Sequence, residues 1–526
     1  MIRPMSSHSA ALRAALAAAA AAALVALPAL ADPATDYADH CAACHGADRL
    51  GGTGPALIPE TLGRMRGPNL HAVIATGRAA TQMPGFADTL DDAAIVDLAA
   101  FLQTPLTDLP AWGAAEIDAS REMRADYRPA AAPVFDADPL NLTLVVETGD
   151  HHISVLDGDS FAVLDRFATP FAVHGGPKFT PDGRFVFVMS RDGWVQKYDL
   201  WSLAEVGRVR AGLNSRNIAM SHDGQWLAVA NYLPGTLTIL ATDDLSVARI
   251  FTVVSRSGQH SRVSAVYQAP QRMSFILALK DAPEIWEIAT DPDADPVYEG
   301  FVHSNEKNMI EALPSSEGLF ARRRIETAEP IDDFFFTPDY RFLVGAARDG
   351  ARGVVVNLNV GREIADLPLP GMPHLGSGIS WLRDGRRVMA TPHLKEGRLS
   401  VIDVDSWEVI DTIDTEGPGF FLRSHETSPH VWADVFFGPN RDAMHIIDKQ
   451  SLKIVRTLRP VPGATVAHVE FTRDGEEALV SVWEDDGAVI VYDAATLEEI
   501  TRLPMRKPSG KYNVWNKITF SDGTSH

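Results

Sequence analysis

A short unit of turn and strand first appears as Phe179-Thr180-Pro181-Asp182-Gly183-Arg184-Phe185-Val186-Phe187-Val188. Its Asp-Gly pair is typical of a tight turn, and the alternating apolar residues after it are typical of a strand. Related units recur around Asp223, Asp339, Asp384 and Asp474. The first two aspartates of the series are 41 residues apart, and the next two are 45 apart. A period of this length with strand texture predicts a β-propeller.

The number of blades follows from the number of units. Fainter copies lie near Pro270 and Pro429, and a last copy, Ser521-Asp522-Gly523, lies at the C-terminus with no room for a further blade. Strands near residues 142–156 would supply the missing part, so the two ends of the propeller should close one shared blade. The sequence therefore predicts an all-β eight-bladed propeller over residues 134–526, with seven blades as the alternative.

Ahead of the propeller lies the run Cys41-Ala42-Ala43-Cys44-His45, which holds the only two cysteines of the chain. Two thiols at this spacing can add across the vinyl groups of a haem, and the adjacent histidine can bind its iron. Met83, 38 residues beyond the histidine, would close the sixth iron position, with Met65 as a competitor. Histidine–methionine ligation raises the haem potential relative to bis-histidine ligation, which suits an electron acceptor. His71 is more typical of a surface histidine.

The surroundings of this motif are helical. Residues 91–102 repeat apolar positions at helical spacing, and Asp91 or Thr89 would cap that helix. Residues 32–105 resemble a small all-α class I cytochrome c domain. Residues 106–133, rich in alanine and proline, are typical of a linker. The chain is thus predicted to be multi-domain, with a cytochrome c domain followed by the propeller.

Residues 1–31 have the pattern of an export signal. Arg3 and Arg13 give a positive start, residues 14–30 are apolar, and Ala29-Leu30-Ala31 is a small-x-small cleavage site. A membrane anchor is the alternative, but the stretch is mostly alanine, a weak inserter. We therefore expect a periplasmic protein that is cleaved after Ala31, with no membrane span in the mature chain.

The formal net charge of −22 disfavours nucleic acid as a partner, because phosphates require basic surfaces. The same charge suits a basic electron-transfer partner through electrostatic steering, although it could equally serve solubility.

Four histidines stand out in the propeller: His174, His374, His393 and His468. Each taken singly suits a structural or surface role. Three of them come just ahead of a turn unit, so they could all point into the same central funnel and share a ligand.

Two of these histidines lie in segments that resemble the cytochrome cd1 group, and the resemblance covers essentially the whole mature chain. The segments are Val173-His174-Gly175 with Ser190-Arg191-Asp192-Gly193, Pro373-His374 with Gly376 and Gly378, and Lys511-Tyr512-Asn513-Val514. The resemblance implies a non-covalent haem d1, or its dihydro form, bound in the propeller. It also implies that His174 is the iron ligand and that His374 lies on the opposite face.

Two departures separate the chain from the nitrite reductases of this group. The segment 330–336 lacks their second distal histidine, and only nine residues separate Asp32 from Cys41, so their tyrosine-bearing arm is missing. Both departures fit the branch of the group that desaturates dihydro-haem d1, in which a propionate becomes an acrylate. In that branch the covalent haem would accept the two electrons.

On this hypothesis His468 is the candidate base, because a neutral imidazole can take a proton near neutral pH. Tyr512 would position the base or the substrate, and His374 would fill or guard the other face. Arg191 and Arg216 are the expected partners of the macrocycle carboxylates, with Arg256 and Arg423 as weaker candidates.

The electrons would pass to a soluble cytochrome, with the nitrite reductase or another haem d1 maturation protein as a further partner. Three alternatives remain open: a nitrite reductase that forms nitric oxide, a non-catalytic carrier or insertion factor for haem d1, and a bare electron-transfer protein.

Overall fold

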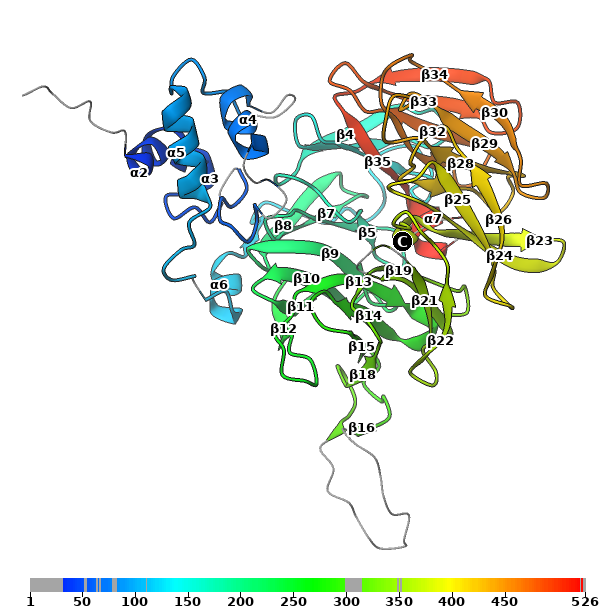
Figure 1. The fold of residues 1–526 in the computed structure, drawn as a ribbon, viewed down its shortest axis with the longest axis horizontal. Helices are drawn as coiled ribbons and strands as arrows, with labels where there is room; N and C mark the ends of the chain where they lie inside the picture. The colour runs from blue at the N-terminus through cyan, green and yellow to red at the C-terminus, as the bar shows by residue number, and fades with distance from the viewer. Residues whose placement is uncertain are drawn as a thin grey trace, which may run out of the picture.

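The computed structural model describes residues 32–51, 54–62, 65, 68–77, 83–109, 111–298, 315–347, 350, 352–520 and 522–523. The predicted signal segment 1–31 lies outside the described residues. Within the described ranges, no helix is both long and apolar enough to cross a membrane. The described chain forms a small helical domain beside a large ring of sheets (Figure 1).

The described part of the N-terminal domain contains four helices, α2 (Pro33–His40), α3 (Ala42–His45), α4 (Pro68–Thr76) and α5 (Asp92–Leu102). The side chain of Asp91 accepts a hydrogen bond of 2.9 Å from the Ala94 N–H, so Asp91 is the predicted cap of α5. Apolar faces of α2, α4 and α5 pack together through Tyr37, Ile74 and Leu98. The sequence prediction of a small all-α domain is confirmed.

The segment predicted as a linker carries structure of its own. Helix α6 (Ala114–Ala119) buries Ile117 in the core of the first blade, and strand β1 (Glu122–Met123) pairs with the outer strand of that blade. The indole N–H of Trp112 donates a hydrogen bond of 2.9 Å to the Arg210 carbonyl. These contacts attach the connection firmly to the propeller.

Eight antiparallel sheets of four strands or more, counted over the described residues, form the ring. From the axis outward, blade 1 contains β5 (Lys178–Phe179), β6 (Phe185–Met189), β7 (Trp194–Asp199) and β8 (Ala204–Arg210), with β1 outside. Blade 2 contains β9 (Asn214–Met220), β10 (Trp226–Leu233), β11 (Thr236–Ala241) and β12 (Val247–Thr252). Blade 3 contains β13 (Val263–Ala269), β14 (Ser274–Leu279), β15 (Glu284–Ala289) and β18 (Arg322–Glu326), with the turn η1 (Pro270–Arg272) and a ribbon of β16 (Val297–Tyr298) and β17 (Ser315–Ser316).

The second half of the ring repeats this pattern. Blade 4 contains β19 (Ile331–Phe336), β20 (Phe342–Ala347), β21 (Gly353–Asn357) and β22 (Arg362–Leu367). The turn η2 (Leu375–Ser377) leads to blade 5. Blade 5 contains β23 (Ile379–Arg383), β24 (Arg386–Pro392), β25 (Arg398–Asp403) and β26 (Glu408–Asp414). Blade 6 contains β27 (Leu422–Arg423), β28 (His430–Asp434), β29 (Met444–Asp448) and β30 (Ile454–Leu458). Blade 7 contains β31 (Val466–Phe471), β32 (Glu477–Val482), β33 (Ala488–Asp493) and β34 (Glu499–Pro504).

Blade 8 is closed by the two ends of the propeller, as predicted. Strand β35 (Pro508–Asn513) pairs with β2 (Thr143–Glu147), which is followed by β3 (His152–Leu156) and β4 (Val163–Ala168). The last strand therefore lies beside the first ones in Figure 1. Helix α7 (Val514–Thr519) follows β35. The side-chain amide of Asn513 donates to the Asn141 side-chain oxygen at 3.0 Å. This bond links the C-terminal strand to the N-terminal strands of blade 8.

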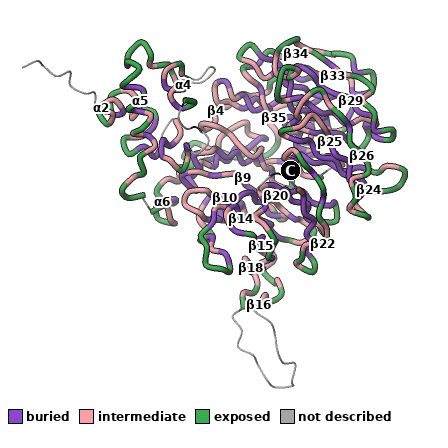
Figure 2. The backbone as a smooth tube through the Cα atoms, in the orientation of Figure 1, coloured by how far each residue is buried: buried purple, intermediate pink, exposed green. Residues whose placement is uncertain are grey.

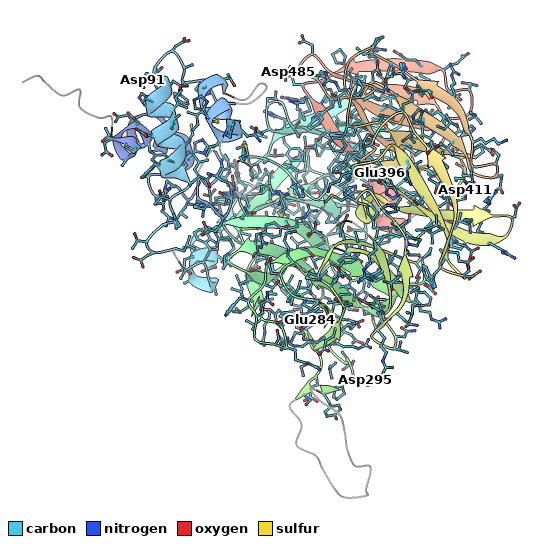
Figure 3. All side chains as sticks on the ribbon, in the orientation of Figure 1. Asp91, Glu284, Asp295, Glu396, Asp411 and Asp485 are labelled. Carbon is cyan, nitrogen blue, oxygen red and sulfur yellow. The ribbon has the colours of Figure 1, made fainter. Side chains whose placement is uncertain are left out.

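Seven of the turn units join the innermost strand of a blade to its second strand, whereas the unit at Asp522 does not, because blade 8 is closed by pairing instead of by a hairpin. The turns need a left-handed residue, and Gly183 supplies it with a φ of 72°. Buried residues fill the inner and middle strands, while exposed residues gather at the rims (Figure 2). Asp91, Asp295, Asp411 and Asp485 lie on the outer parts of the molecule, where they contribute to its acidic surface (Figure 3).

Candidate functional site

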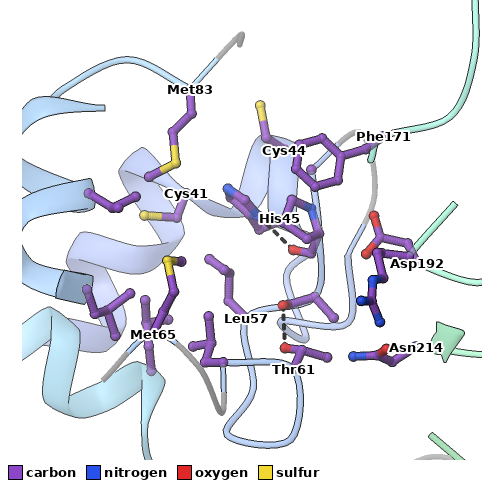
Figure 4. A pocket seen from close by; sticks show the side chains of 18 of the residues that line it. Cys41, Cys44, His45, Leu57, Thr61, Met65, Met83, Phe171, Asp192 and Asn214 are labelled. Carbon is purple, nitrogen blue, oxygen red and sulfur yellow. Dashed lines mark hydrogen bonds between the residues drawn. The ribbon is translucent and has the colours of Figure 1, made fainter. Parts of the chain in front are cut away.

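The cysteine motif opens onto a cavity of about 560 Å³ in the helical domain. Cys41 and Cys44, which form no disulfide, line this cavity together with His45 (Figure 4). Apolar side chains, including Leu57 and Ile74, form much of its remaining wall. A flat apolar macrocycle with two thioether links matches this combination of wall and thiols.

His45 is held in one orientation. Its Nδ1 lies 2.7 Å from the Pro55 carbonyl oxygen, and because a carbonyl only accepts, Nδ1 carries the proton and Nε2 keeps its lone pair. A Cβ at Gly54 would lie 2.7 Å from Cε1 of the ring, so only glycine fits against the imidazole. Burial lowers the pKa of His45, which keeps the ring neutral. The residues present therefore fit a covalently attached haem with His45 as an iron ligand.

Both candidate methionines line the same cavity. In Figure 4 the thioethers of Met83 and Met65 approach the region of Cys41 from opposite sides. The assignment of Met83 as the second iron ligand therefore stays a prediction. His71 pairs with Asp92 at 2.8 Å and is not part of the cavity lining, in keeping with a surface role.

The second candidate site is a circuit of side chains around the axis of the propeller. Each innermost strand, or the loop leading into it, contributes at least one member: His174, Arg216, Tyr267, Asp333, His374, Phe420 with Phe421, His468 and Tyr512. We call this set the axial ring. Most successive members contact one another, so blades that are far apart in sequence converge on one site.

One half of the axial ring is polar. His174 lies against Arg216, whose Nη1 is 3.0 Å from His174 Nε2. Arg216 interacts electrostatically with Tyr267 and with Asp333. The Tyr267 hydroxyl donates to Asp333 Oδ1 at 3.2 Å, and Asp333 Oδ2 lies 3.5 Å from His374 Nε2. A carboxylate thus lies at the Nε2 edge of the His374 imidazole.

The other half is aromatic. The His374 ring lies 4.3 Å from the Phe420 ring, and Phe420 is followed by Phe421 at 4.6 Å. Phe421 meets the imidazole of His468 edge-on at 4.7 Å, and His468 lies 5.5 Å from Tyr512. The aromatic half contains the predicted base and the predicted positioning tyrosine next to each other.

Tyr512 closes the circuit back to His174. A Cβ at Gly176 would lie 2.8 Å from the Tyr512 ring, and the φ of Gly176 is 69°, so glycine is required there on both counts. Gly176 is two residues from His174. Burial raises the pKa of Tyr512 to about 12, so its hydroxyl remains a hydrogen-bond donor.

His174 is surrounded by cations. Its Nδ1 lies 2.7 Å from the Arg216 carbonyl oxygen, which makes Nε2 the lone-pair nitrogen. Arg191 Nη2 is 3.1 Å from that Nε2, close to the approach of Arg216. The predicted iron ligand and the two predicted carboxylate partners are therefore brought together. An iron at Nε2 would displace both guanidinium groups, which would then be available to carboxylates.

His468 sits on a bulge of β31 with a φ of 51°, a strained conformation for a residue with a side chain. Burial, with the charges of Lys511 and Arg423, holds the pKa of His468 well below its usual range. The Lys511 ammonium donates to the His468 carbonyl at 2.8 Å, and the His468 N–H donates to Asp434 at 3.2 Å. The imidazole is thus neutral and fixed in place.

Sequence reasoning missed several charged residues of this region. Burial lowers the pKa of Lys178 to about 8, with a further contribution from Arg423. Burial also raises the pKa of Asp434 to about 6. Lys178 is the first residue of β5 and Lys511 lies within β35, so a cation in an inner strand was the available signal.

The three remaining candidates, Arg423, Arg256 and His393, have different surroundings. Arg423 is buried beside this group, as the weaker hypothesis allowed. Arg256 pairs with the exposed Glu326 at 3.4 Å, in keeping with a surface salt bridge, and its role at the mouth stays a prediction. His393 is buried and bonded to Pro370 and to Ser400, which is a structural role.

The two sites lie next to each other. The cavity that contains the cysteine motif is also lined by Arg191, Asp192, Tyr232 and Arg262 from the propeller. Arg191 therefore touches both that cavity and His174 of the axial ring. An arrangement of two adjoining macrocycle sites is suited to electron transfer between them.

Comparison with known proteins defines the class. Residues 137–517 match the cytochrome D1 heme domain family, and residues 28–102 match the family of cytochrome c oxidase, cbb3-type, subunit III. The first match covers most of the chain, so the chain belongs to the cytochrome D1 heme domain family.

Individual relatives refine the comparison. The chain is 51% identical over 495 residues to dihydro-heme d1 dehydrogenase of Pseudomonas aeruginosa, covering 93% of this chain and 95% of that protein. A solved structure described as dihydro-heme d1 dehydrogenase NirN in complex with DHE superposes with a TM-score of 0.84, covering 93% of this chain and 100% of that one. Nitrite reductase of Stutzerimonas stutzeri is 24% identical over 547 residues, covering 92% of each protein.

Proposed function

We propose that this chain oxidises dihydro-haem d1 to haem d1 by desaturating one propionate side chain to an acrylate. The observation that carries the proposal is the 51% identity, over nearly all of both chains, to a protein named for this activity. The reaction removes two hydrogens from adjacent carbons, as two protons and two electrons, and leaves a carbon–carbon double bond.

The axial ring supports the binding of such a substrate. Its aromatic half offers flat apolar surface through Phe420, Phe421 and Tyr512, and its polar half offers cations for carboxylates. His174, whose Nε2 keeps its lone pair, is the proposed iron ligand. His374, held by Asp333, guards the other face.

His468 is the proposed base. Its low pKa keeps the imidazole neutral at neutral pH, and the Tyr512 ring next to it is a surface against which the reacting side chain can be placed. Lys511 and Asp434 hold the backbone of His468, so the base has a fixed position. Tyr512, protonated at neutral pH, is able to donate a hydrogen bond to a substrate carboxylate.

The covalent haem held by Cys41, Cys44 and His45 would take the two electrons one at a time, and each would pass to an external cytochrome before the next is taken. Arg191 lines the haem cavity and also contacts His174. The path of the electrons from the substrate site to the covalent haem would therefore be short. We also propose that the mature protein is periplasmic and that a soluble cytochrome receives the electrons from it. The acidic net charge of −22 favours a basic surface on that partner.

A nitrite reductase activity is the second candidate, because one relative with that name shares the whole layout at 24% identity. The axial ring argues against it. Asp333 is the residue that the strand β19 places next to His374, and Phe334 to Phe336, which follow it, are buried in the blade cores. The segment 330–336 therefore supplies no second proton-donating imidazole.

The deciding experiment is to add dihydro-haem d1 to the purified, oxidised protein and to record both haem spectra with time. Conversion of the added macrocycle together with reduction of the covalent haem is the expected result. Binding without conversion, followed by transfer of the macrocycle to an apo-reductase, would support a carrier instead. Rapid nitrite turnover with reductant would support the reductase.

A further inference from the structure

Three cations surround the ring of Tyr232 on the propeller side of the haem cavity. The guanidinium carbons of Arg262 and Arg191 lie 5.3 and 6.0 Å from the centre of the ring, and the Lys280 ammonium lies 5.5 Å from it. We call these four residues the Tyr232 cluster. Three neighbouring blades contribute to it, and all four side chains line the cavity that contains the cysteine motif.

The acidic partners of two of these cations lie behind the cavity wall. Arg262 donates to both carboxylate oxygens of Asp281, at 2.8 and 2.6 Å, and Lys280 forms an ion pair with Asp332. Neither aspartate is among the described residues that line the cavity. Each ion pair therefore holds its cation in place with the cationic end toward the cavity.

Two carboxylates also belong to the described wall of the cavity, those of Glu60 and Asp192. Glu60 is exposed, so water and salt screen its charge. Burial raises the pKa of Asp192 to about 7, so this carboxyl is partly protonated at neutral pH. The positive side chains of the Tyr232 cluster therefore dominate the electrostatics of this wall.

A side-chain amide on the same wall lacks a partner. The Oδ1 atom of Asn214 is buried and has no hydrogen-bond partner among the described residues, and Asn214 lines the cavity. A buried polar atom costs free energy unless it forms a hydrogen bond. Rotation of the amide exchanges its oxygen with its nitrogen, so the same group can donate to an anion. The wall is thus prepared for a polar ligand beside the cations.

The cavity takes its two kinds of functional group from different domains. The helical domain supplies the thiols and His45, whereas the three arginine and lysine side chains among the described lining residues belong to the propeller. A haem that is attached through its vinyl groups keeps its propionate side chains free. A buried carboxylate needs cations or hydrogen-bond donors, and the Tyr232 cluster with Asn214 offers both.

We propose that the Tyr232 cluster and Asn214 form a binding site for a tetrapyrrole carboxylate, and that a propionate of the covalent haem occupies it. The propeller then holds the helical domain through the haem as well as through protein contacts such as the bond of 2.7 Å from Arg210 Nη2 to the Leu50 carbonyl. The inference goes beyond the proposed desaturation and does not depend on it.

The substrate is a second source of the same chemistry. It is also a tetrapyrrole with carboxylates, and Arg191 lies 3.1 Å from His174 Nε2 in the axial ring. Measurements on the covalent haem without substrate, and on substrate binding separately, therefore distinguish the two sources.

The experiment uses R262Q/D281N in the full-length protein with its covalent haem. This double substitution removes one cation of the Tyr232 cluster with its acidic partner and leaves the net charge unchanged. Resonance Raman spectroscopy without substrate follows the bending mode of the haem propionates, which moves when a carboxylate loses its cation. We expect this mode to shift and the haem c reduction potential to fall, because a carboxylate without its cation stabilises the ferric iron. The affinity for dihydro-haem d1 should stay unchanged.

The matched control is R272Q/E287Q, which removes a similar ion pair from the same blade. Arg272 donates to both carboxylate oxygens of Glu287, at 2.8 and 3.1 Å, and neither residue is among the described residues that line the cavity. The propionate mode and the potential should not move in this control. If R262Q/D281N does not fold, K280M/D332N removes the other ion pair of the Tyr232 cluster and takes its place.

Three results would overturn the inference. An unchanged propionate mode and potential would show that no haem propionate is bound by the Tyr232 cluster. Equal shifts in R272Q/E287Q would assign the effect to a general loosening of blade 3. A weaker affinity for dihydro-haem d1, with the covalent haem unchanged, would assign the cluster to the substrate instead. If the wild-type protein fails to oxidise dihydro-haem d1, the proposed function fails, while the spectra and potentials still decide the role of the cluster.

Discussion

Replacement of His468 by glutamine is the most direct perturbation of the proposed chemistry. Glutamine cannot take a proton at neutral pH, yet its side-chain oxygen can still accept the contact that the Lys511 N–H makes with His468 Nδ1 at 3.4 Å. The substitution therefore removes the base and keeps most of the local bonding. General bases contribute about 100- to 10,000-fold, which corresponds to about 2.7 to 5.4 kcal/mol of barrier.

The structural consequence of H468Q should be smaller. The imidazole loses its ring contacts with Phe421 and Tyr512, and each such contact stabilises by about 0.5 to 1.5 kcal/mol. A loss of about 1 to 3 kcal/mol leaves a protein of ordinary stability folded. The expected result is thus substrate binding close to normal with desaturation slowed by at least about 100-fold.

The assay follows the absorption change of bound dihydro-haem d1 in single-turnover mixing, with thermal unfolding measured in parallel. H393Q is the matched control, because His393 is buried and bonded to Ser400 at 2.9 Å but lies outside the axial ring. It should lower the melting temperature without changing the rate. A desaturation rate within a few-fold of wild type in H468Q would refute the assignment of the base.

The same assignment has a pH signature. A base acts in its neutral form, which is complete above its pKa and is lost as pH falls through it. Since burial and Lys511 hold the pKa of His468 well below 6.5, the rate should be flat from pH 8 down to pH 6. A rate that falls by half or more over that interval would contradict the low pKa.

Three further outcomes are expected. H174A should weaken substrate binding by about tenfold or more in a spectroscopic titration, because it removes the proposed iron ligand. Of M83L and M65L, only M83L should lower the haem c reduction potential, since loss of a thioether ligand removes its positive contribution; the reverse would make Met65 the ligand. Substrate affinity should fall as pH rises above 8, because burial lowers the pKa of Lys178 to about 8 and the deprotonated amine no longer attracts carboxylates. A bound carboxylate raises this pKa, so the charge of the complex is lost only at higher pH. K178M should bind more weakly at pH 7 and lack that fall.

Much of the fold was predictable because its signals are local. A tight turn needs a residue at positive φ, and the Asp-Gly pairs recur with the period of one blade, so turns such as the one at Gly183 mark the ring along the chain. The closure of blade 8 followed from counting, since a final unit with no room for strands requires the N-terminal strands. The connection through α6 and β1 was missed, because its short segments acquire structure only by packing against blade 1.

The sites divide in the same way. The covalent haem motif was predictable in full, because Cys41, Cys44 and His45 act within five residues of each other and their chemistry depends on that spacing. His174, His374 and His468 could be proposed as a group from their similar positions ahead of turn units. Their partners Asp333, Asp434 and Lys511 were not proposed, because a single charged residue in a strand gives no sign of burial.

By itself the amino-acid sequence determined a covalent haem site, a series of turn units with the period of one blade, and a set of candidate histidines. Only the tertiary structure decided that these histidines join one axial ring and that this ring adjoins the cytochrome cavity. The physical reason is separation along the chain. Arg210 reaches Leu50 across 160 positions, and the burial that lowers the pKa of His468 comes from other blades. Such contacts depend on how the blades pack against one another and against the helical domain. No local sequence pattern predicts this packing.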